Sequence, residues 1–259
     1  MSFNISSVTI AKNEERNIAR CIRSLEGVAD EIIVLIDNET SDRTEPIVSE
    51  FKNVRHQRAE WEGYSRTKKK AIDMASNDWI LWIDADEELT PALRDEILQM
   101  KKNEPGLKQY SIPRKAYFLG KWIKHSGWYP GRVIRFFNRK FSSLSDNDVH
   151  EKLVTTGETG KLINDLNHYT DPSIEHYFNK FNLYTTLAAK ELYSKNKRAG
   201  MGSVITRSFS LFVKMYILRG GFLDGLHGLI LAVFSSVYVF TKYAKLWEMN
   251  QPAANHEQQ

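Results

Sequence analysis

Short apolar stretches alternate along the chain with polar loops and with segments whose apolar residues recur at helical spacing. Residues 5–10 and 31–36 have the pattern of strands, and each is followed by a loop and then by apolar positions three or four residues apart. A short third strand is expected near residue 54, a helix over 65–75 and a fourth strand over 79–83. Strands that alternate with helices in this way predict a mostly parallel, doubly wound α/β sheet.

The strand expected at residues 79–83 is apolar throughout, which is typical of a strand buried on both faces of a sheet. It ends at Asp84-Ala85-Asp86, at the edge where open α/β sheets bind ligands. Two neighbouring carboxylates repel each other unless a cation lies between them, and their hard oxygens suit Mg²⁺ or Mn²⁺. The alternative is a solvated acidic turn before the helix that begins at Thr90 and Pro91, and the motif alone leaves both open.

Two further loops with polar or acidic residues follow the first two expected strands. Residues 11–15 read Ala-Lys-Asn-Glu-Glu, and residues 37–44 read Asp-Asn-Glu-Thr-Ser-Asp-Arg-Thr. On its own the second loop would more often cap a helix. Because three such loops occur at successive strand ends, the sequence favours a ligand site at the carboxyl edge of the sheet.

Several of these motifs, in this order, resemble the inverting family 2 glycosyltransferases of the GT-A fold, a Rossmann-like α/β fold. Two others resemble more narrowly the bacterial β-glucosyltransferases that extend the lipopolysaccharide inner core. The family resemblance rests on residues 7–15, 37–44 and 79–87, and the narrower one on residues 62–68 and 127–130. One departure is that Glu39 and Arg43 stand where relatives usually have glycine, so the backbone of this loop is expected to turn differently.

The resemblance implies roles for particular residues. The side chains that would border the uracil and ribose of a UDP-sugar are Thr9, Ala11, Glu14 and Asp37. Lys68 would lie near the nucleotide or its phosphates, and Asp84 would approach both the ribose and the metal. Asp86 would hold the Mg²⁺ or Mn²⁺ that bridges the diphosphate. His168 would be a further metal ligand, although a lone histidine is more often structural.

The stretch Asp148-Val149-His150-Glu151 resembles the acidic motif on the acceptor side of the family. The resemblance favours Glu151 as the catalytic base. Alternation along an extended segment would turn Asp148 and His150 to the opposite face.

Aromatic residues crowd into the short strands and turns expected between residues 110 and 154. Such rings stack on sugar faces, and Arg132 or Arg135 could bind phosphate. An aromatic core with surface arginines would have the same pattern, and the sequence leaves both open.

The C-terminal part of the chain is basic and apolar, although the net charge of the whole chain is only +4. Between residues 195 and 247 the only acid is Asp224, and the basic residues are Lys195, Lys197, Arg198, Arg207, Lys214, Arg219, Lys242 and Lys245. Apolar stripes flanked by basic residues suit helices that lie in a membrane interface. An oligomer contact or a cover for the main core is the alternative.

Helical spacing predicts a helix over residues 174–192, whose apolar stripe is expected to pack on the sheet. A flexible linker at 195–202 and an amphipathic helix ending at Gly220-Gly221 follow, and then a helix over 226–243. The clean apolar stretch of this last helix is shorter than the ~20 residues that a bilayer crossing requires. We therefore expect a GT-A catalytic domain at 1–194, a helical amphipathic extension at 195–250 and a disordered tail at 251–259.

The single cysteine, Cys21, excludes an internal disulfide, and the N-terminus lacks the pattern of a secretion signal. We expect a cytoplasmic protein, peripheral on the inner face of the cytoplasmic membrane, with no nucleic-acid partner. The expected activity is metal-dependent inverting transfer of a hexose, glucose first among them, from a UDP-sugar. The acceptor would be a glycan or lipid-linked saccharide of the bacterial envelope, such as lipopolysaccharide core.

Two other classes of protein share parts of this pattern. A sugar nucleotidyltransferase generally carries a glycine-rich basic loop after its first strand, where this chain has Lys12-Asn13-Glu14-Glu15. A non-catalytic, membrane-tethered nucleotide-sugar-binding module would tolerate the loss of Asp86 or Glu151, and both acids are present.

Overall fold

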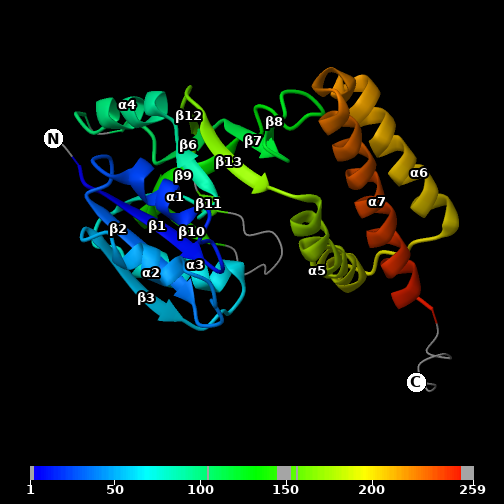
Figure 1. The fold of residues 1–259 in the computed structure, drawn as a ribbon, viewed down its shortest axis with the longest axis horizontal. Helices are drawn as coiled ribbons and strands as arrows, with labels where there is room; N and C mark the ends of the chain where they lie inside the picture. The colour runs from blue at the N-terminus through cyan, green and yellow to red at the C-terminus, as the bar shows by residue number, and fades with distance from the viewer. Residues whose placement is uncertain (1–2, 104, 145–152, 156, 252–259) are drawn as a thin grey trace. The chain divides into compact units, whose positions relative to one another are not determined.

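The computed structural model describes residues 3–103, 105–144, 153–155 and 157–251, and its ribbon is drawn in Figure 1. The chain forms two compact units. The first comprises Met1–Ala116 and Pro130–Thr170, and the second comprises Tyr117–Tyr129 and Asp171–Gln259. This division differs from the predicted boundary at residue 194, because the helix that precedes that boundary belongs to the second unit.

A seven-stranded sheet with the order β12-β6-β9-β4-β1-β2-β3 forms the centre of the first unit. Its strands are β1 (Ile5–Ala11), β2 (Glu31–Asp37), β3 (Val54–Ala59), β4 (Trp79–Trp82), β6 (Gln109–Ile112), β9 (Val133–Asn138) and β12 (Gly160–Lys161). Strands β3, β2, β1 and β4 are parallel, whereas β9 runs antiparallel to both of its neighbours. The predicted mixed α/β fold with a mostly parallel sheet is confirmed.

The order of the strands identifies the edge at which a ligand would bind. From β1 the chain moves through β2 to β3 on one side, and it then returns to place β4 on the other side of β1. Where the chain continues from two neighbouring strands toward opposite sides of the sheet, the loops after these strands separate. They leave a crevice at the carboxyl ends of the strands. The loop after Ala11 and the loop that begins at Ile83 leave the sheet at this point.

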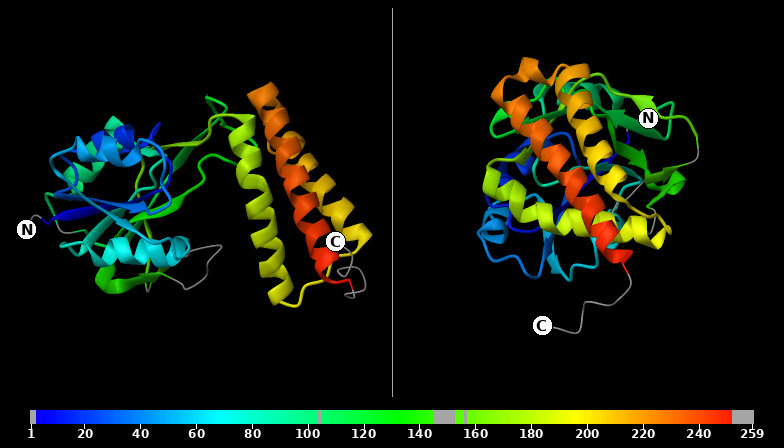
Figure 2. Two further views of the ribbon diagram at one scale, coloured as in Figure 1. Left: turned by 60° about the horizontal axis from the view of Figure 1, so that its bottom comes forward. Right: turned by 90° about the vertical axis from the view of Figure 1, so that its right-hand side faces the viewer.

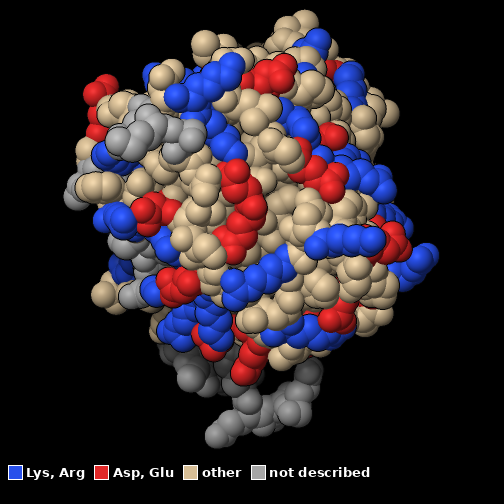
Figure 3. All heavy atoms as spheres, turned by 90° about the vertical axis from the view of Figure 1, so that its left-hand side faces the viewer, with Lys and Arg blue, Asp and Glu red and all other residues tan. Residues whose placement is uncertain are grey.

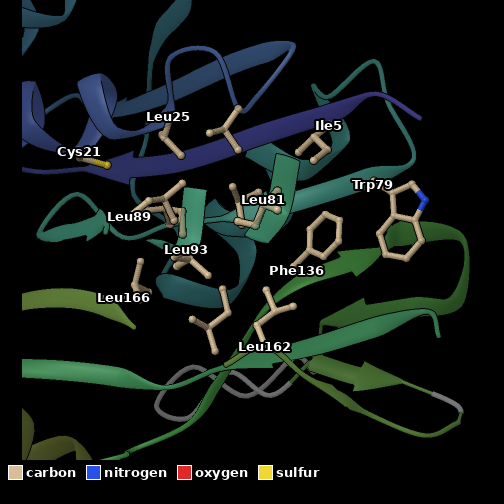
Figure 4. Close-up of a cluster of buried hydrophobic side chains, with 14 of the residues drawn as sticks. Ile5, Cys21, Leu25, Trp79, Leu81, Leu89, Leu93, Phe136, Leu162 and Leu166 are labelled. Carbon is tan, nitrogen blue, oxygen red and sulfur yellow. The ribbon is translucent and has the colours of Figure 1, made fainter. Parts of the chain in front are cut away.

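Alternate side chains of the central strands pack against helices on the two faces of the sheet. The helices of this unit are α1 (Ile18–Leu25), α2 (Thr44–Ser49), α3 (Tyr64–Asp73) and α4 (Pro91–Met100). Figure 4 shows the cluster on the α1 and α4 face, where Trp79 stacks on Phe136 with ring centroids 4.8 Å apart. Trp82 points to the opposite face, into the cluster that includes Ala71 and Ile72 of α3.

Smaller strands complete the structure. A four-stranded sheet has the order β5-β13-β7-β8, with β5 at Glu87–Leu89, β13 at Leu166–Asp171, β7 at Arg114–Phe118 and β8 at Lys121–Trp122. A short helix, η1 (Arg139–Phe141), leads into β10 (Ser142–Leu144), which pairs with β11 (Leu153–Thr155). Charged side chains of both signs are interspersed on the face drawn in Figure 3, in keeping with the small net charge.

The second unit contains three long helices, α5 (Ile174–Ser194), α6 (Met201–Phe212) and α7 (Leu226–Met249). Helix α7 packs against both of the others, as the two views in Figure 2 show. Two short helical turns, η2 (Val213–Leu218) and η3 (Gly221–Asp224), join α6 to α7.

The apolar stripe of α5 contacts a sheet only in part, since Tyr177 lies 6.3 Å from Phe118 of β7 while other rings of the stripe face α7. Tyr177 lies 5.0 Å from Phe234 of α7, and Phe181 lies 5.9 Å from Tyr238 of α7, measured between ring centroids. The apolar stripe of α5 therefore covers another helix, because α7 offers a matching row of aromatic rings.

The last helix is longer than the sequence pattern predicts, since it continues past residue 243 to Met249. With 24 residues it is long and apolar enough to cross a bilayer, by length and composition only. The whole helix is thus longer than the clean apolar stretch on which the sequence expectation rested. Gly228 lies within the helix and does not interrupt it. A side chain at this position would collide with the carbonyl oxygen of Gly221, and glycine permits the close approach of the two segments.

Candidate active site

Asp84 follows the buried strand β4 and lies between two buried cations. Its Oδ1 is 3.0 Å from Nζ of Lys68, and its Oδ2 accepts a hydrogen bond from the Arg135 guanidinium. Burial alone would raise the pKa of Asp84, but the charges of Arg135 and Lys68 outweigh it and hold the pKa well below its usual range. Asp84 is therefore an anion at all ordinary pH values.

Arg135 comes from β9, the antiparallel neighbour of β4, and connects Asp84 to a second carboxylate. Its guanidinium donates to Oε1 of Glu87 at 2.7 Å, and Arg114 lies 3.7 Å from the same oxygen. The backbone N–H of Asp84 donates to the other Glu87 oxygen at 3.0 Å. Arg135 is 6% exposed and Glu87 is 1% exposed, so this is a buried ion-pair network rather than a surface contact.

Replacing Arg135 with methionine should lower the free energy of unfolding by about 3–5 kcal/mol, because it leaves the buried Glu87 carboxylate without its closest cation. Urea denaturation would measure the loss. Arg55→Met is the matched control, since Arg55 is exposed and pairs with Glu31 at 3.8 Å. The control should lose at most about 1 kcal/mol. Equal losses in the two variants would contradict a structural role for the buried network.

Asp86 and His168 form a second pair beside the first. Oδ2 of Asp86 lies 3.3 Å from Nε2 of His168, and both side chains are mostly buried. Strand β13 places the histidine, because it pairs with β5 in a register that sets His168 opposite Glu87. The backbone N–H of Tyr169 also donates to the carbonyl oxygen of Asp86 at 2.9 Å. A residue 82 positions farther along the chain therefore meets the second aspartate of the motif.

The Asp86 and His168 pair offers a carboxylate oxygen and an imidazole nitrogen to a divalent cation. Nδ1 of His168 is buried and has no hydrogen-bond partner among the described residues, so no described group fixes this ring through Nδ1. Within the described parts of the chain, no group of three or more His, Cys, Asp or Glu side chains could hold a metal. Two protein ligands fit a cation whose remaining positions are filled by substrate phosphates and water.

The loops after β1 and β2 are bound to each other. Glu14 N donates to the Thr44 hydroxyl at 2.7 Å, and Glu15 N donates to Oδ2 of Asp42 at 2.9 Å. Burial alone would raise the pKa of Asp42, but its hydrogen bonds from Thr44 and Glu15 lower it. Asp42 and Thr44 therefore join the two loops at the crevice. Asp42 also accepts from the Thr44 backbone N–H at 2.9 Å, although the N-cap residue of α2 is Arg43, which makes no side-chain capping bond.

Asp37, at the end of β2, is buried and pairs with Lys12 from the first loop, whose Nζ lies 2.9 Å from its Oδ2. Lys12 also donates to Glu39, and these two carboxylates raise its pKa, with the Glu39 hydrogen bond as the larger cause. Glu39 thus gives the loop an ion pair at a position where relatives usually have glycine.

The other predicted donor-site residues lie near the same edge of the sheet. Thr9 and Ala11 are buried on β1, and the Thr9 hydroxyl is 4.0 Å from Sγ of Cys21 on α1. Glu14 follows in the loop, where its Oε2 accepts a hydrogen bond from Asn17 at 2.9 Å. Their contacts with a nucleotide stay predictions. Glu151, together with Asp148 and His150, lies outside the described residues.

The three consecutive lysines of α3 point in different directions, because consecutive residues lie on different sides of a helix. Lys68 is buried, with Nζ 4.0 Å from the centre of the Trp82 ring. Lys69 pairs with Asp73 at the surface, and Lys70 pairs with Glu62. Of the three, only Lys68 is directed toward Asp84.

Sequence reasoning missed Glu87 and the contact that Arg135 makes with it. Glu87 is the residue after Asp86, and its charge resembled that of a solvated turn. Arg135 is not on the surface, because it is buried and its Nη2 contacts both carboxylates. Phosphate binding by Arg135 stays a prediction. Arg132 also has a structural role, since it donates to the carbonyl oxygens of Ser111 and Leu162 at 3.2 Å and 2.9 Å.

A mostly parallel sheet with acidic residues at the carboxyl end of the strand beside its switch point is the arrangement that the resemblance to GT-A glycosyltransferases led us to expect. Residues 6–163 match Glycosyl transferase family 2, and the chain belongs to this family. The resemblance proposed from the sequence is therefore confirmed.

Named relatives agree with the assignment, and one solved structure is reported beside them for comparison. An uncharacterized glycosyltransferase of Rickettsia typhi is 32% identical over 97% of this chain and 89% of its own length. The lipopolysaccharide core biosynthesis glycosyltransferase LpsC of Rhizobium meliloti is 28% identical over 94% of this chain and 92% of its own. The crystal structure of residues 1–349 of S. aureus TarS superposes with a TM-score of 0.45 and 11% identity, covering 95% and 90% of the two chains.

Proposed function

We propose that this chain is a metal-dependent, inverting hexosyltransferase that uses a UDP-sugar, with UDP-glucose as the first candidate donor. The observation that carries the proposal is the close placement of Asp86 and His168 next to Asp84, at the carboxyl end of β4. A carboxylate and an imidazole at this edge suit a cation whose coordination a diphosphate completes. Family membership supplies the general activity, and this pair supports the metal.

Each residue of the site has a distinct task in the proposal. Asp86 and His168 hold Mg²⁺ or Mn²⁺, which when bound offsets the charge that develops on the leaving diphosphate. Asp84 is proposed to lie near the ribose, where its ion pairs with Lys68 and Arg135 fix its position. Such a preorganised arrangement spends no free energy on reorganisation during the reaction.

The acceptor hydroxyl needs a base on the side of the sugar opposite the leaving group, and we assign this task to Glu151. Leu153, two residues later, packs against the hydrophobic cluster that contains Trp82. This contact places Leu153 on the face of the sheet that packs against α3, the helix of Lys68. A single displacement would convert an α-linked donor into a β-linked product.

The proposed acceptor is a glycan or lipid-linked saccharide of the bacterial envelope, with lipopolysaccharide core as the leading example. Support comes from the 28% identity with LpsC, which extends over nearly the whole chain. An acceptor carried on lipid agrees with the proposed location of the protein on the cytoplasmic face of the membrane.

A donor panel tests the proposal directly. The purified chain is incubated with UDP-, GDP- and dTDP-hexoses in Mn²⁺ or Mg²⁺, and the release of free nucleoside diphosphate is measured. We expect release from a UDP-hexose and its loss in EDTA. Release of pyrophosphate from a nucleoside triphosphate and a sugar phosphate would instead indicate a nucleotidyltransferase. Activity that is unchanged by EDTA would exclude the metal site.

A further inference from the structure

The turn that joins α6 to α7 exposes a compact group of large apolar side chains, which we call the apolar knuckle. It comprises Ile217, Leu218, Phe222, Leu223 and Leu226. Each is more than half exposed, from 51% for Phe222 to 75% for Leu218. The turn that carries these residues is the orange end of the α6 and α7 pair in Figure 1. Single exposed apolar residues are ordinary, but a contiguous group marks an interaction surface.

Hydrogen bonds hold the backbone of the knuckle in place. The carboxylate of Asp224 accepts from the backbone N–H groups of Lys124 at 3.3 Å and His125 at 2.9 Å. Nδ1 of His125 lies 3.1 Å from the same side chain, and Nζ of Lys121 donates to the Asp224 carbonyl oxygen at 2.8 Å. The only acid between residues 195 and 247 is therefore turned inward and buried.

The exposed charged residues of the turn and of the adjoining segment 121–125 are positive. Lys214 and Arg219 are exposed on the turn itself. Lys121 and Lys124 are exposed on the segment that forms hydrogen bonds with the turn. In a two-fold contact between identical copies, the same cations would face one another. An anionic lipid surface fits better, because apolar side chains enter the boundary of the acyl chains while cations meet the phosphates.

A crossing of the bilayer by α7 would also account for its apolar residues, but the polar contacts between α7 and α5 argue against such a crossing. The Tyr238 hydroxyl donates to the Tyr184 carbonyl oxygen at 3.2 Å. Nζ of Lys245 donates to Oδ1 of Asn182 at 2.8 Å and to the Thr186 hydroxyl at 2.7 Å. A crossing would break these bonds in a medium that cannot replace them.

We infer that the apolar knuckle inserts into the interface of an anionic bilayer while α7 stays packed on α5 and α6. The surface lies entirely within the second unit, and the inference uses none of the residues assigned to sugar transfer. Binding to lipid is measured without donor or acceptor, so its failure is distinct from a failure of the proposed function.

Sedimentation with vesicles tests the inference. The intact chain should bind phosphatidylcholine vesicles that contain phosphatidylglycerol and bind pure phosphatidylcholine vesicles much more weakly. A variant with Leu218→Asp and Leu223→Asp should lose at least about tenfold in affinity, since burying one leucine contributes roughly a factor of ten. Ile163→Asp is the matched control, because Ile163 is 81% exposed but lies in the first unit.

A fluorescence measurement does not depend on a disruptive charge. A polarity-sensitive dye is attached to Leu223→Cys or, as the control, to Ile163→Cys. The native Cys21 should not react, because it is buried and burial raises the pKa of its thiol. Vesicles should shift the emission of the dye at position 223 to the blue and leave the control unchanged.

Three results would overturn the inference. The first is an intact chain that ignores anionic vesicles at low salt. The second is a double variant that binds them as well as the Ile163→Asp control does. The third is a dimer that the double variant converts to a monomer without any change in binding to vesicles, which would identify a second copy as the partner.

Discussion

Replacing Asp86 with alanine should abolish sugar transfer and leave the fold intact. In the proposed site this carboxylate holds the metal together with His168, and the substitution leaves one member of that pair. Losing the ion would remove its stabilisation of the leaving diphosphate, so turnover should fall by about 10³-fold or more. The carbonyl oxygen that accepts from Tyr169 N is part of the backbone and is retained in the variant. Release of nucleoside diphosphate measures turnover, and thermal denaturation reports the fold.

Asp73→Ala is the matched control for this prediction. Asp73 is an exposed aspartate on α3 whose ion pair is with Lys69 at the surface, so its loss should change neither turnover nor stability measurably. Raising the metal concentration should not restore turnover in Asp86→Ala. Wild-type turnover of Asp86→Ala in buffer that contains a chelator would show that Asp86 has no role in metal binding.

Much of the fold could be predicted because buried strands have a distinct composition. Strand β4 is apolar at all four positions and buried throughout, and the alternation of strands with helices already indicated a parallel sheet. One feature, the surface that α5 covers, depended on contacts that periodicity does not reveal. A stripe such as that of α5 shows that a helix has an apolar face, but it does not identify the surface that covers it.

The candidate site was partly predictable for a similar reason. The acidic motif after β4 stands out because charge follows a buried strand, and the resemblance added Lys68 and His168. The link from Asp84 to Arg135 was not predictable, since 51 residues separate them and only the antiparallel pairing of β9 with β4 brings them together. Arginine in an aromatic segment has the same sequence pattern whether it pairs with a buried carboxylate or lies at the surface.

The proposed role of Glu151 as the catalytic base can be tested by replacing its carboxylate with an amide. Glu151→Gln keeps the shape of the side chain but removes its capacity to accept the proton of the attacking hydroxyl. Turnover should therefore fall by about 10²–10⁴-fold, the usual contribution of a positioned general base. Donor and metal affinity should stay close to wild type, because the proposed donor site is formed by other residues. Steady-state kinetics would show the loss in kcat rather than in the KM for the donor.

Asp148→Asn is the control that distinguishes the two faces of this segment. Alternation along an extended chain would place Asp148 with His150, on the face opposite Glu151, so its change should affect turnover much less. The opposite result, near-normal transfer by Glu151→Gln and strong loss in Asp148→Asn, would move the base to the other face of the segment. It would leave the enzyme class unchanged, because family membership and the Asp86 and His168 pair do not depend on which of these acids takes the proton.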